Sequence, residues 1–375
     1  MGAIRTGHTP LWGARRGKGG SWLWRLLASP LILWEYLFYQ RPNVTTEKTR
    51  PADWARLQSE WRFWDALVCY VGPPSHFLWN IKCPLLGTMV VSCVVVLYEY
   101  GRTQLGWNVP DLDKSNVMND AYRLSSFAMS LLLSLRLGRA YERWWSARCT
   151  FAGVGSAAST LVGQAVAWID SPQLRNDIRR WAVVWHYSIL HICTAAEDLH
   201  PKGAALLGEE ELALYRASRK PRQLAYQQLR LLVVQGKRHG LSEDAALAMD
   251  ATIVKGVSDA GTCVRIKFQA LPQTLTLVST GFLQIWLLLV PLGLQGEWLE
   301  LVAVFFTALL LLSVDEAATQ LENPFPMLPL EEILDSTVRD TARTLEEAEA
   351  LRALQHSCSK RLSADSNVVV GVGAH

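Results

Sequence analysis

The sequence predicts an all-α membrane protein in which four helices cross a bilayer and a large helical portion lies in water. Two observations carry this prediction. Long apolar stretches with little charge occur on both sides of residues 171–270, and that intervening region is polar with helical periodicity. Half of the 375 residues are apolar, yet the mean hydropathy is only +0.11, so only part of the chain belongs in the bilayer.

Residues 1–50 are predicted to form a basic leader and an interfacial segment. The first 30 residues carry arginine and lysine but no acid, which suits either an organelle transit peptide or a basic tail beside a membrane. Residues 22–39 are apolar but interrupted by Arg25, Pro30 and Glu35. We therefore expect them to lie in the membrane interface rather than to cross the bilayer. Residues 54–70 are again amphipathic and rich in tryptophan.

The first two predicted spans surround a polar loop. The first covers residues 81–100, and the second covers residues 121–142 of a longer helix that runs to residue 148. In this helix Phe127, Leu131 and Leu135 stand four residues apart and share one face. The stripe has two interpretations: it packs against neighbouring helices, or it lines the axis of an oligomer as a hydrophobic constriction.

The end of this helix changes in character. Arg136 and Arg139 follow the stripe, and the pair Trp144–Trp145 comes one turn later. Arginine and tryptophan are favoured where an apolar helix meets the membrane–water interface. The two arginines also have two interpretations, because they either attract anions along an axis or snorkel to the interface.

The rest of the chain supplies a soluble portion and two more spans. Residues 149–170 are rich in small residues and predict either a membrane helix or a tightly packed helix outside the bilayer, and their weak hydrophobicity favours the second. The basic region 171–270 belongs on the cytosolic side or its topological equivalent. Residues 272–294 carry no charge and residues 298–314 carry only Glu300, which gives the third and fourth spans. A helix over 331–356 and a disordered tail beyond 357 follow, so residues 346–375 hold a helix end and that tail.

No catalytic centre is evident in the sequence. It has no GxSxG, Walker or GxGxxG motif, and the histidines between His186 and His200 lack the spacing of a metal site. The seven cysteines include no CxxC pair, and the net charge of +3 comes without a basic stripe. We therefore expect no enzyme activity, no metal or cofactor, and no nucleic acid as a partner.

Three segments resemble the bestrophin family, in particular its bacterial, plant and algal members. They are LLLSLRLGRAYERWWSAR at 131–148, the Pro-led third span within 265–294, and DEAATQLENPFPMLPL at 315–330. The most specific part of the resemblance is a pair of blocks: Arg143, Trp144 and Trp145, and then Asn323, Pro324 and Phe325. The resemblance covers residues 51–345, which it identifies as the channel domain.

The resemblance implies a homopentamer that conducts anions, chloride or bicarbonate, passively along its axis. In that family three residues one helical turn apart line a narrow hydrophobic neck. Counting back from the Arg-Trp-Trp block places them at Phe127, Leu131 and Leu135, the stripe already found by periodicity. The two motif blocks are expected to hold the subunit together rather than to touch the ion.

One departure and two alternatives accompany this expectation. Animal bestrophins follow the Asn-Pro-Phe block with acids that bind calcium, whereas Pro326 to Leu330 follow it here, so we expect no calcium clasp of that type. The alternative functions are an ion-coupled transporter or a non-conducting membrane scaffold. The expected partners are other copies of the chain, membrane lipid and the anions. The expected location is a multi-pass position in either a plastid membrane, such as the thylakoid, or the plasma membrane.

Overall fold

The computed structural model describes residues 77–108, 110, 117–293 and 298–371, and every regular element in them is helical, as predicted. The leader and interfacial segment predicted within residues 1–50, and the amphipathic stretch 54–70, lie outside the described residues. The α-helices are α5 (Phe77–Gln104), α6 (Val117–Trp168), α7 (Pro172–Thr194), α8 (Pro201–Ala204), α9 (Glu209–Ala217), α10 (Pro221–Gly236), α11 (Glu243–Phe268), α12 (Gln273–Leu289), α13 (Trp298–Glu322) and α14 (Leu330–Gly371). Short 3-10 turns are η1 (Lys237–His239), η2 (Val290–Gly293) and η3 (Phe325–Met327).

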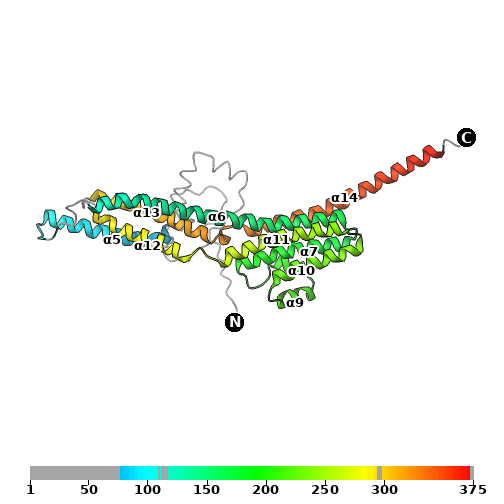
Figure 1. Cartoon of the computed structure of the whole chain (residues 1–375), viewed down its shortest axis with the longest axis horizontal. Coiled ribbons are helices and arrows are strands. Elements are labelled where there is room, and N and C mark those ends of the chain that lie inside the picture. Colours follow the sequence, from blue (N-terminus) through cyan, green and yellow to red (C-terminus); the bar gives the residue numbers. More distant parts are fainter. Residues whose placement is uncertain (1–76, 109, 111–116, 294–297, 372–375) are drawn as a thin grey trace, which may run out of the picture.

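Helix α6 runs along most of the molecule and connects its two ends (Figure 1). Its 52 residues, at about 1.5 Å each, give a length of about 78 Å. The sequence predicted a helix to residue 148 and a separate helix over 149–170, and this division is wrong. No proline interrupts residues 117–168, and isolated glycines weaken a helix without ending it.

The small residues of α6 allow close packing instead. A side chain added at Gly155 would collide with the Thr337 hydroxyl oxygen and would lie 2.9 Å from a ring carbon of His186. One added at Gly153 would collide with the carboxylate of Asp259. The glycines therefore let α7, α11 and α14 approach the α6 backbone, which explains why this part of α6 is weakly hydrophobic and still well packed.

Among the described residues, three helical segments are long and apolar enough to cross a membrane: Asn80–Gln104, Thr274–Gly293 and Trp298–Glu322. They match three of the four predicted spans. Only 22% to 33% of the residues in their most apolar windows are buried within the chain, so most of their apolar surface faces outward. The predicted span 121–142 is not among them, because its serines and arginines lower its hydropathy.

The first half of α6 nevertheless packs with these segments. Met129 and Leu133 are 1% and 3% exposed and share a small apolar cluster with residues of α5, α12 and α13, including Leu283 and Leu312. We call α5, α12, α13 and residues 117–142 of α6 the apolar part. It occupies one end of the molecule (Figure 1).

The other end is a bundle that we call the helical body: residues 143–168 of α6 with α7, α9, α10, α11 and the first turns of α14. It holds a much larger core, in which Phe151, Trp185 and Ile253 are fully buried. Helix α7 begins with Ser171, whose side chain accepts a hydrogen bond from the Leu174 amide, and with Pro172 at its first turn. These signals turn the chain back from α6 into the bundle.

Helix α14 is longer than predicted. The sequence predicted a helix over 331–356 and a disordered tail, whereas the helix runs to Gly371 and its last part extends beyond the helical body (Figure 1). Between Leu330 and Gly371 the chain has neither proline nor an internal glycine. The polar composition therefore suggested disorder at a place where no residue breaks the helix.

Candidate pore-lining face and its anchoring cluster

The predicted neck residues lie on a face of α6 that the described helices of the same chain leave uncovered. Phe127, Leu131 and Leu135 are 75%, 51% and 59% exposed, whereas Met129 and Leu133 on the opposite face are buried. The helical period of about 3.6 residues separates the two sets. In the isolated chain the stripe therefore does not serve as packing against its own neighbours.

The same face continues along the whole of α6 and becomes polar. Beyond the stripe, Glu142, Cys149, Ser156 and Thr160 are exposed and follow at helical spacing. An apolar stretch is thus followed, on one continuous helix face, by the exposed Trp145 and then by small and polar side chains. Such a face can form a narrow dry constriction that opens into a wetter passage when several copies surround an axis.

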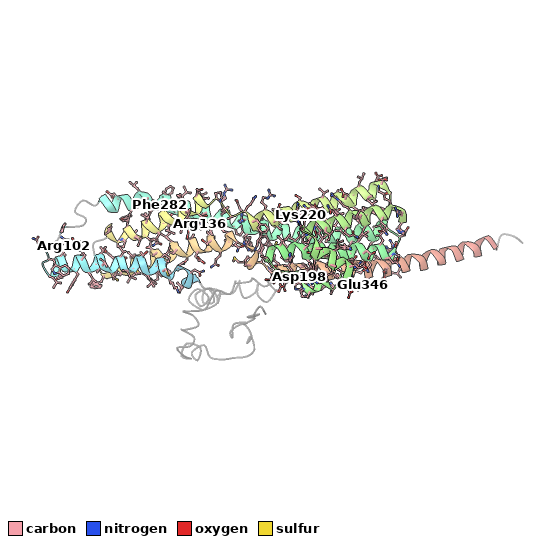
Figure 2. All side chains as sticks on the ribbon, turned by 90° about the horizontal axis from the view of Figure 1, so that it is seen from below. Arg102, Arg136, Asp198, Lys220, Phe282 and Glu346 are labelled. Atoms are coloured by element: carbon pink, nitrogen blue, oxygen red, sulfur yellow. The ribbon has the colours of Figure 1, made fainter. Side chains whose placement is uncertain are left out.

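The two arginines after the stripe occupy different environments. Arg139 is exposed, and its Nη1 atom lies 3.3 Å from a carboxylate oxygen of Glu142, a weak pair between side chains that are 69% and 67% exposed. Arg136 points the other way and is only 4% exposed. Figure 2 shows Arg136 inside the apolar part.

Arg136 joins three helices through a buried polar cluster. Its guanidinium donates to Thr280 of α12 at 2.7 Å and to the carboxylate of Asp315 of α13. It also donates to the Thr319 hydroxyl at 3.0 Å and to a carboxylate oxygen of Glu322 at 3.3 Å. Its positive charge is thereby paired within the subunit, and attraction of anions by Arg136 stays a prediction.

Sequence reasoning missed this cluster, although a signal was present. Arg136 stands in an apolar stretch, and Asp315 and Glu322 stand at the end of another. Charges in apolar helices are costly unless they pair, so opposite charges on two such helices are candidates for a pair. The distance of 179 positions between Arg136 and Asp315 hid the connection.

The first motif block ties together the ends of two helices. The Arg143 side chain donates to the backbone oxygen of Glu322 at 2.8 Å, of Gln269 at 2.5 Å, and of Ile266. These carbonyls belong to the last turns of α13 and α11, where unpaired oxygens and the helix dipole favour a cation. Arg143 thus fixes the junction between the apolar part and the helical body.

The remaining motif residues divide into buried and exposed positions. Pro324 and Phe325 are buried, and Trp144 packs against the core of the helical body. The Trp144 ring also stacks on that of Tyr141, with ring centroids 5.8 Å apart. Trp145 and Asn323 are exposed. Arg143 contacts the backbone of Glu322, the residue before Asn323, so the structure brings the two motif blocks together.

The histidines between 186 and 200 serve separate local purposes. His186 is fully buried against Phe151, with ring centroids 4.6 Å apart, and burial lowers its pKa to about 4. His191 contacts the backbone oxygen of Asp198 at 2.8 Å, and His200 accepts a hydrogen bond from the Lys202 amide at the start of α8. Within residues 77–108, 110, 117–293 and 298–371, no three His, Cys, Asp or Glu side chains gather in a metal-binding arrangement.

Taken together, the fold and this face define a helical membrane protein built on one long helix with an uncovered apolar-to-polar face. Residues 54–344 match the family described as Bacterial/Fungal Bestrophin protein. The chain therefore belongs to the bestrophin family.

Similar proteins and structures agree with this assignment. "Voltage-dependent chloride channel 1, chloroplastic" from Arabidopsis thaliana is 26% identical over 228 residues, covering 57% of this chain and 53% of that protein. The chain thus spans about half the length of that relative. "Voltage-dependent chloride channel 2, chloroplastic" from the same plant is 23% identical over 290 residues, covering 75% of this chain and 69% of that protein.

A crystal structure of a bacterial bestrophin homolog from Klebsiella pneumoniae, in a point-mutant form, has the same fold. It superimposes with a TM-score of 0.63 at 22% identity, covering 71% of this chain and 99% of that one. At this identity the likeness establishes the fold alone.

Proposed function

We propose that the protein is an anion channel whose conducting path follows the axis of a homo-oligomer, a pentamer, with α6 of each copy lining that path. The observation that carries the proposal is the uncovered face of α6, apolar at Phe127, Leu131 and Leu135 and polar beyond them. The two relatives named as chloride channels support chloride as one conducted ion. Bicarbonate is the second candidate ion.

In this proposal the apolar stripe forms the neck and α6 is the fourth span. Copies surrounding an axis would cover the stripe, whereas the exposed leucines of α5 and α13 would face lipid. A hydrophobic constriction passes ions poorly unless it is wide enough to stay wet, so the size of the neck side chains controls conduction. Aromatic and branched side chains at the neck would then set the minimum width.

Arg136 takes a structural role in this proposal and Arg139 keeps an electrostatic one. The buried Arg136 binds α6 to α12 and α13 and so holds the neck-bearing helix in place. The exposed Arg139 lies one turn beyond Leu135, where its charge can attract anions, although Glu142 reduces its field. Arg143 and the Asn323–Phe325 block hold the junction to the helical body.

Anion flux from proteoliposomes tests the proposal. The purified full-length protein is compared with a Leu131→Ala/Leu135→Ala variant, with chloride and then bicarbonate as the internal anion. A matched control, Leu86→Ala/Leu310→Ala, removes two leucines that are equally exposed, at 62% and 64%, on α5 and α13. We expect the neck variant alone to change the size or the chloride-to-bicarbonate ratio of the flux. Intact oligomer that gives no flux above empty liposomes would contradict the proposal and favour a non-conducting scaffold.

A further inference from the structure

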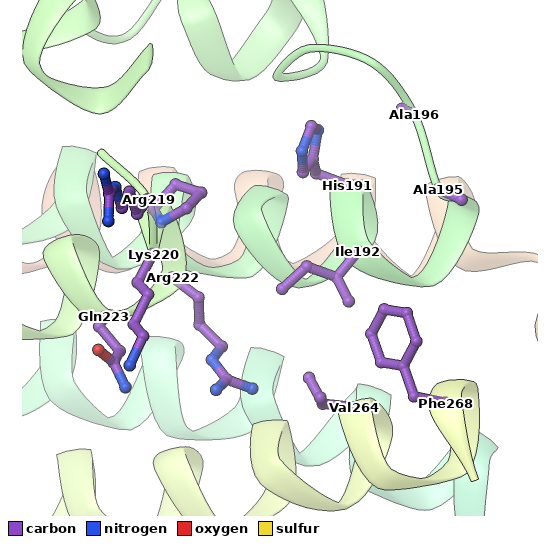
Figure 3. A pocket seen from close by; sticks show the side chains of 11 residues that line it. His191, Ile192, Ala195, Ala196, Arg219, Lys220, Arg222, Gln223, Val264 and Phe268 are labelled. Atoms are coloured by element: carbon purple, nitrogen blue, oxygen red, sulfur yellow. The ribbon is translucent and has the colours of Figure 1, made fainter. Parts of the chain in front are cut away.

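A cavity of about 440 Å³ opens in the helical body, away from the proposed conducting face. It lies between the last turn of α7, the start of α10 and the end of α11. Figure 3 shows Arg222 extending from the start of α10 toward the space that Ile192, Val264 and Phe268 border, with Lys220 beside Gln223. A volume of this size is typical of a small-molecule site.

The cavity lies close to the membrane. Helix α11 ends at Phe268 and the apolar segment of α12 begins at Thr274, so a linker of about 20 Å at most separates them. Along the long axis of the molecule Lys220 lies between Arg136 of the apolar part and Glu346 of the body (Figure 2). A ligand in this cavity can therefore reach the bilayer surface.

The polar wall of the cavity is cationic. Arg219, Lys220 and Arg222 line it, and no lining residue is an acid. None of these three cations forms an ion pair with a carboxylate in the part of the chain that the structure describes. The Nη1 atom of Arg222 is buried and has no hydrogen-bond partner among those residues. A buried guanidinium nitrogen without a partner favours an anionic ligand strongly.

The neighbouring helix ends add to this preference. Helix α10 has 16 residues, and its N-terminus begins at Pro221 without a side-chain cap, so the positive end of its dipole faces the cavity. Helices α7 and α11 both present their C-termini here, but the carbonyls of Ile192 and His191 accept hydrogen bonds from the amides of Ala195 and Ala196, and those at the end of α11 accept from Arg143. The start of α10 is therefore the helix end at this cavity that lacks a side-chain partner.

The opposite wall is apolar. Ile192 and Val264 are partly buried, and Phe268 is 72% exposed at the edge next to the membrane-spanning segment. A free inorganic anion gains nothing from such a wall, whereas a lipid gains from covering it. The cavity thus combines sites for a negative headgroup with a surface for hydrocarbon.

We propose that this cavity binds a membrane lipid with an anionic headgroup. The headgroup contacts Arg222, Lys220 and Arg219, and the first part of the acyl chains covers Val264 and Phe268 on its way to the bilayer. Binding fastens the helical body to the membrane surface. This site is separate from the conducting face of α6.

Native mass spectrometry of the full-length oligomer in detergent tests the lipid site. The probes are dioctanoyl-phosphatidylglycerol, dioctanoyl-phosphatidylcholine and inorganic phosphate. We expect the anionic lipid to bind the wild type at least about tenfold more tightly than the zwitterionic lipid, as a charged group with a buried partner requires. The Arg222→Gln variant should lose that preference.

The matched control is Arg238→Gln, which removes an exposed arginine just beyond the other end of α10. It should bind the anionic lipid as the wild type does. Should Arg222→Gln fail to assemble, Lys220→Gln replaces it, and its affinity for the anionic lipid should be at least about threefold lower than that of the wild type. Equal binding by variant and control, equal binding of the two lipids, or full competition by phosphate at the same concentration would overturn the proposal. Because binding is measured directly, a protein that conducts nothing still gives a result.

Discussion

The apolar part and the helical body are built from the same kind of helix but are stabilised differently. The body encloses a large core around Trp185 and Ile253, whereas the apolar part buries only a small cluster around Met129 and Leu283. The apolar part leaves most of its apolar surface outward, so it needs lipid or other copies to cover that surface. Substitutions in the body should therefore change stability through its internal packing. Substitutions in the apolar part should act through buried polar contacts or through assembly with other copies.

The largest effect is expected at the buried cluster of the apolar part. Arg136→Met leaves the carboxylates of Asp315 and Glu322 without their cation. The free energy of unfolding should fall by about 3–5 kcal/mol. Thermal unfolding and the yield of oligomer in detergent measure this. Arg139→Met, three residues along the same helix, removes an exposed and weakly paired arginine and should cost less than about 0.5 kcal/mol. Similar losses for both variants would contradict the buried cluster.

The next effect concerns His186 in the core of the body. Its pKa of about 4 lies below the ordinary value of 6.5, so an unfolded chain binds the proton more readily than the folded one. Its contribution to the free energy of unfolding is complete above about pH 6.5 and declines by about 3 kcal/mol as the pH falls toward 4. Melting temperatures across this pH range should show less decline for His186→Leu than for the wild type.

The exposed His239 supplies the control for that pH series. His239→Leu should keep the wild-type decline, because it removes an imidazole that lies outside the core. A His186→Leu variant with an unchanged pH profile would show that the buried imidazole does not set this dependence.

Substitution of two glycines of α6 compares how tightly the helix is packed in the body and in the apolar part. In the body, Gly155→Ala places a methyl group against Thr337 and His186 and should cost about 1–3 kcal/mol. In the apolar part, Gly138→Ala meets no atom within 4 Å and should stabilise the helix by up to about 1 kcal/mol. Melting temperatures of the two variants should move in opposite directions. A loss at Gly138 would mean that a second copy approaches this position closely.

The smallest expected effect is on conduction at Arg139. Arg139→Gln removes an exposed charge that Glu142 partly offsets, so chloride flux should fall by less than about threefold. Raising the salt concentration should reduce the difference from the wild type, because screening weakens exposed charges. A complete loss of flux would contradict this small electrostatic contribution of Arg139 to conduction.

The sequence predicted the helical class and three spans because long apolar runs report directly on the bilayer. It did not predict the continuity of α6, since the packing that supports Gly153 and Gly155 comes from Asp259, Thr337 and His186, all far away in the chain. The amphipathic pattern identified the stripe at Phe127, and the structure adds that its own chain leaves the stripe uncovered.

The role of a charged residue is harder to predict from sequence than a span. An arginine in an apolar stretch can snorkel, attract an anion or pair with an acid, and sequence spacing does not distinguish these outcomes for Arg136. Its contacts with Thr280, Asp315 and Glu322 depend on how three helices cross. The cavity at Arg222 was missed for the same reason, because its walls come from three separate helices.

Thiol modification at position 131 tests directly whether the uncovered face of α6 lines the proposed conducting path. Leu131→Cys is placed in a background in which the exposed Cys83, Cys93 and Cys149 are serine, as are Cys69 and Cys358, and Leu310→Cys in the same background is the control. Anion flux from proteoliposomes is recorded before and after a small charged methanethiosulfonate reagent is added. Modification is expected to change the flux of Leu131→Cys and to leave that of Leu310→Cys unaltered. Full modification of Leu131→Cys with no change in flux would contradict this expectation.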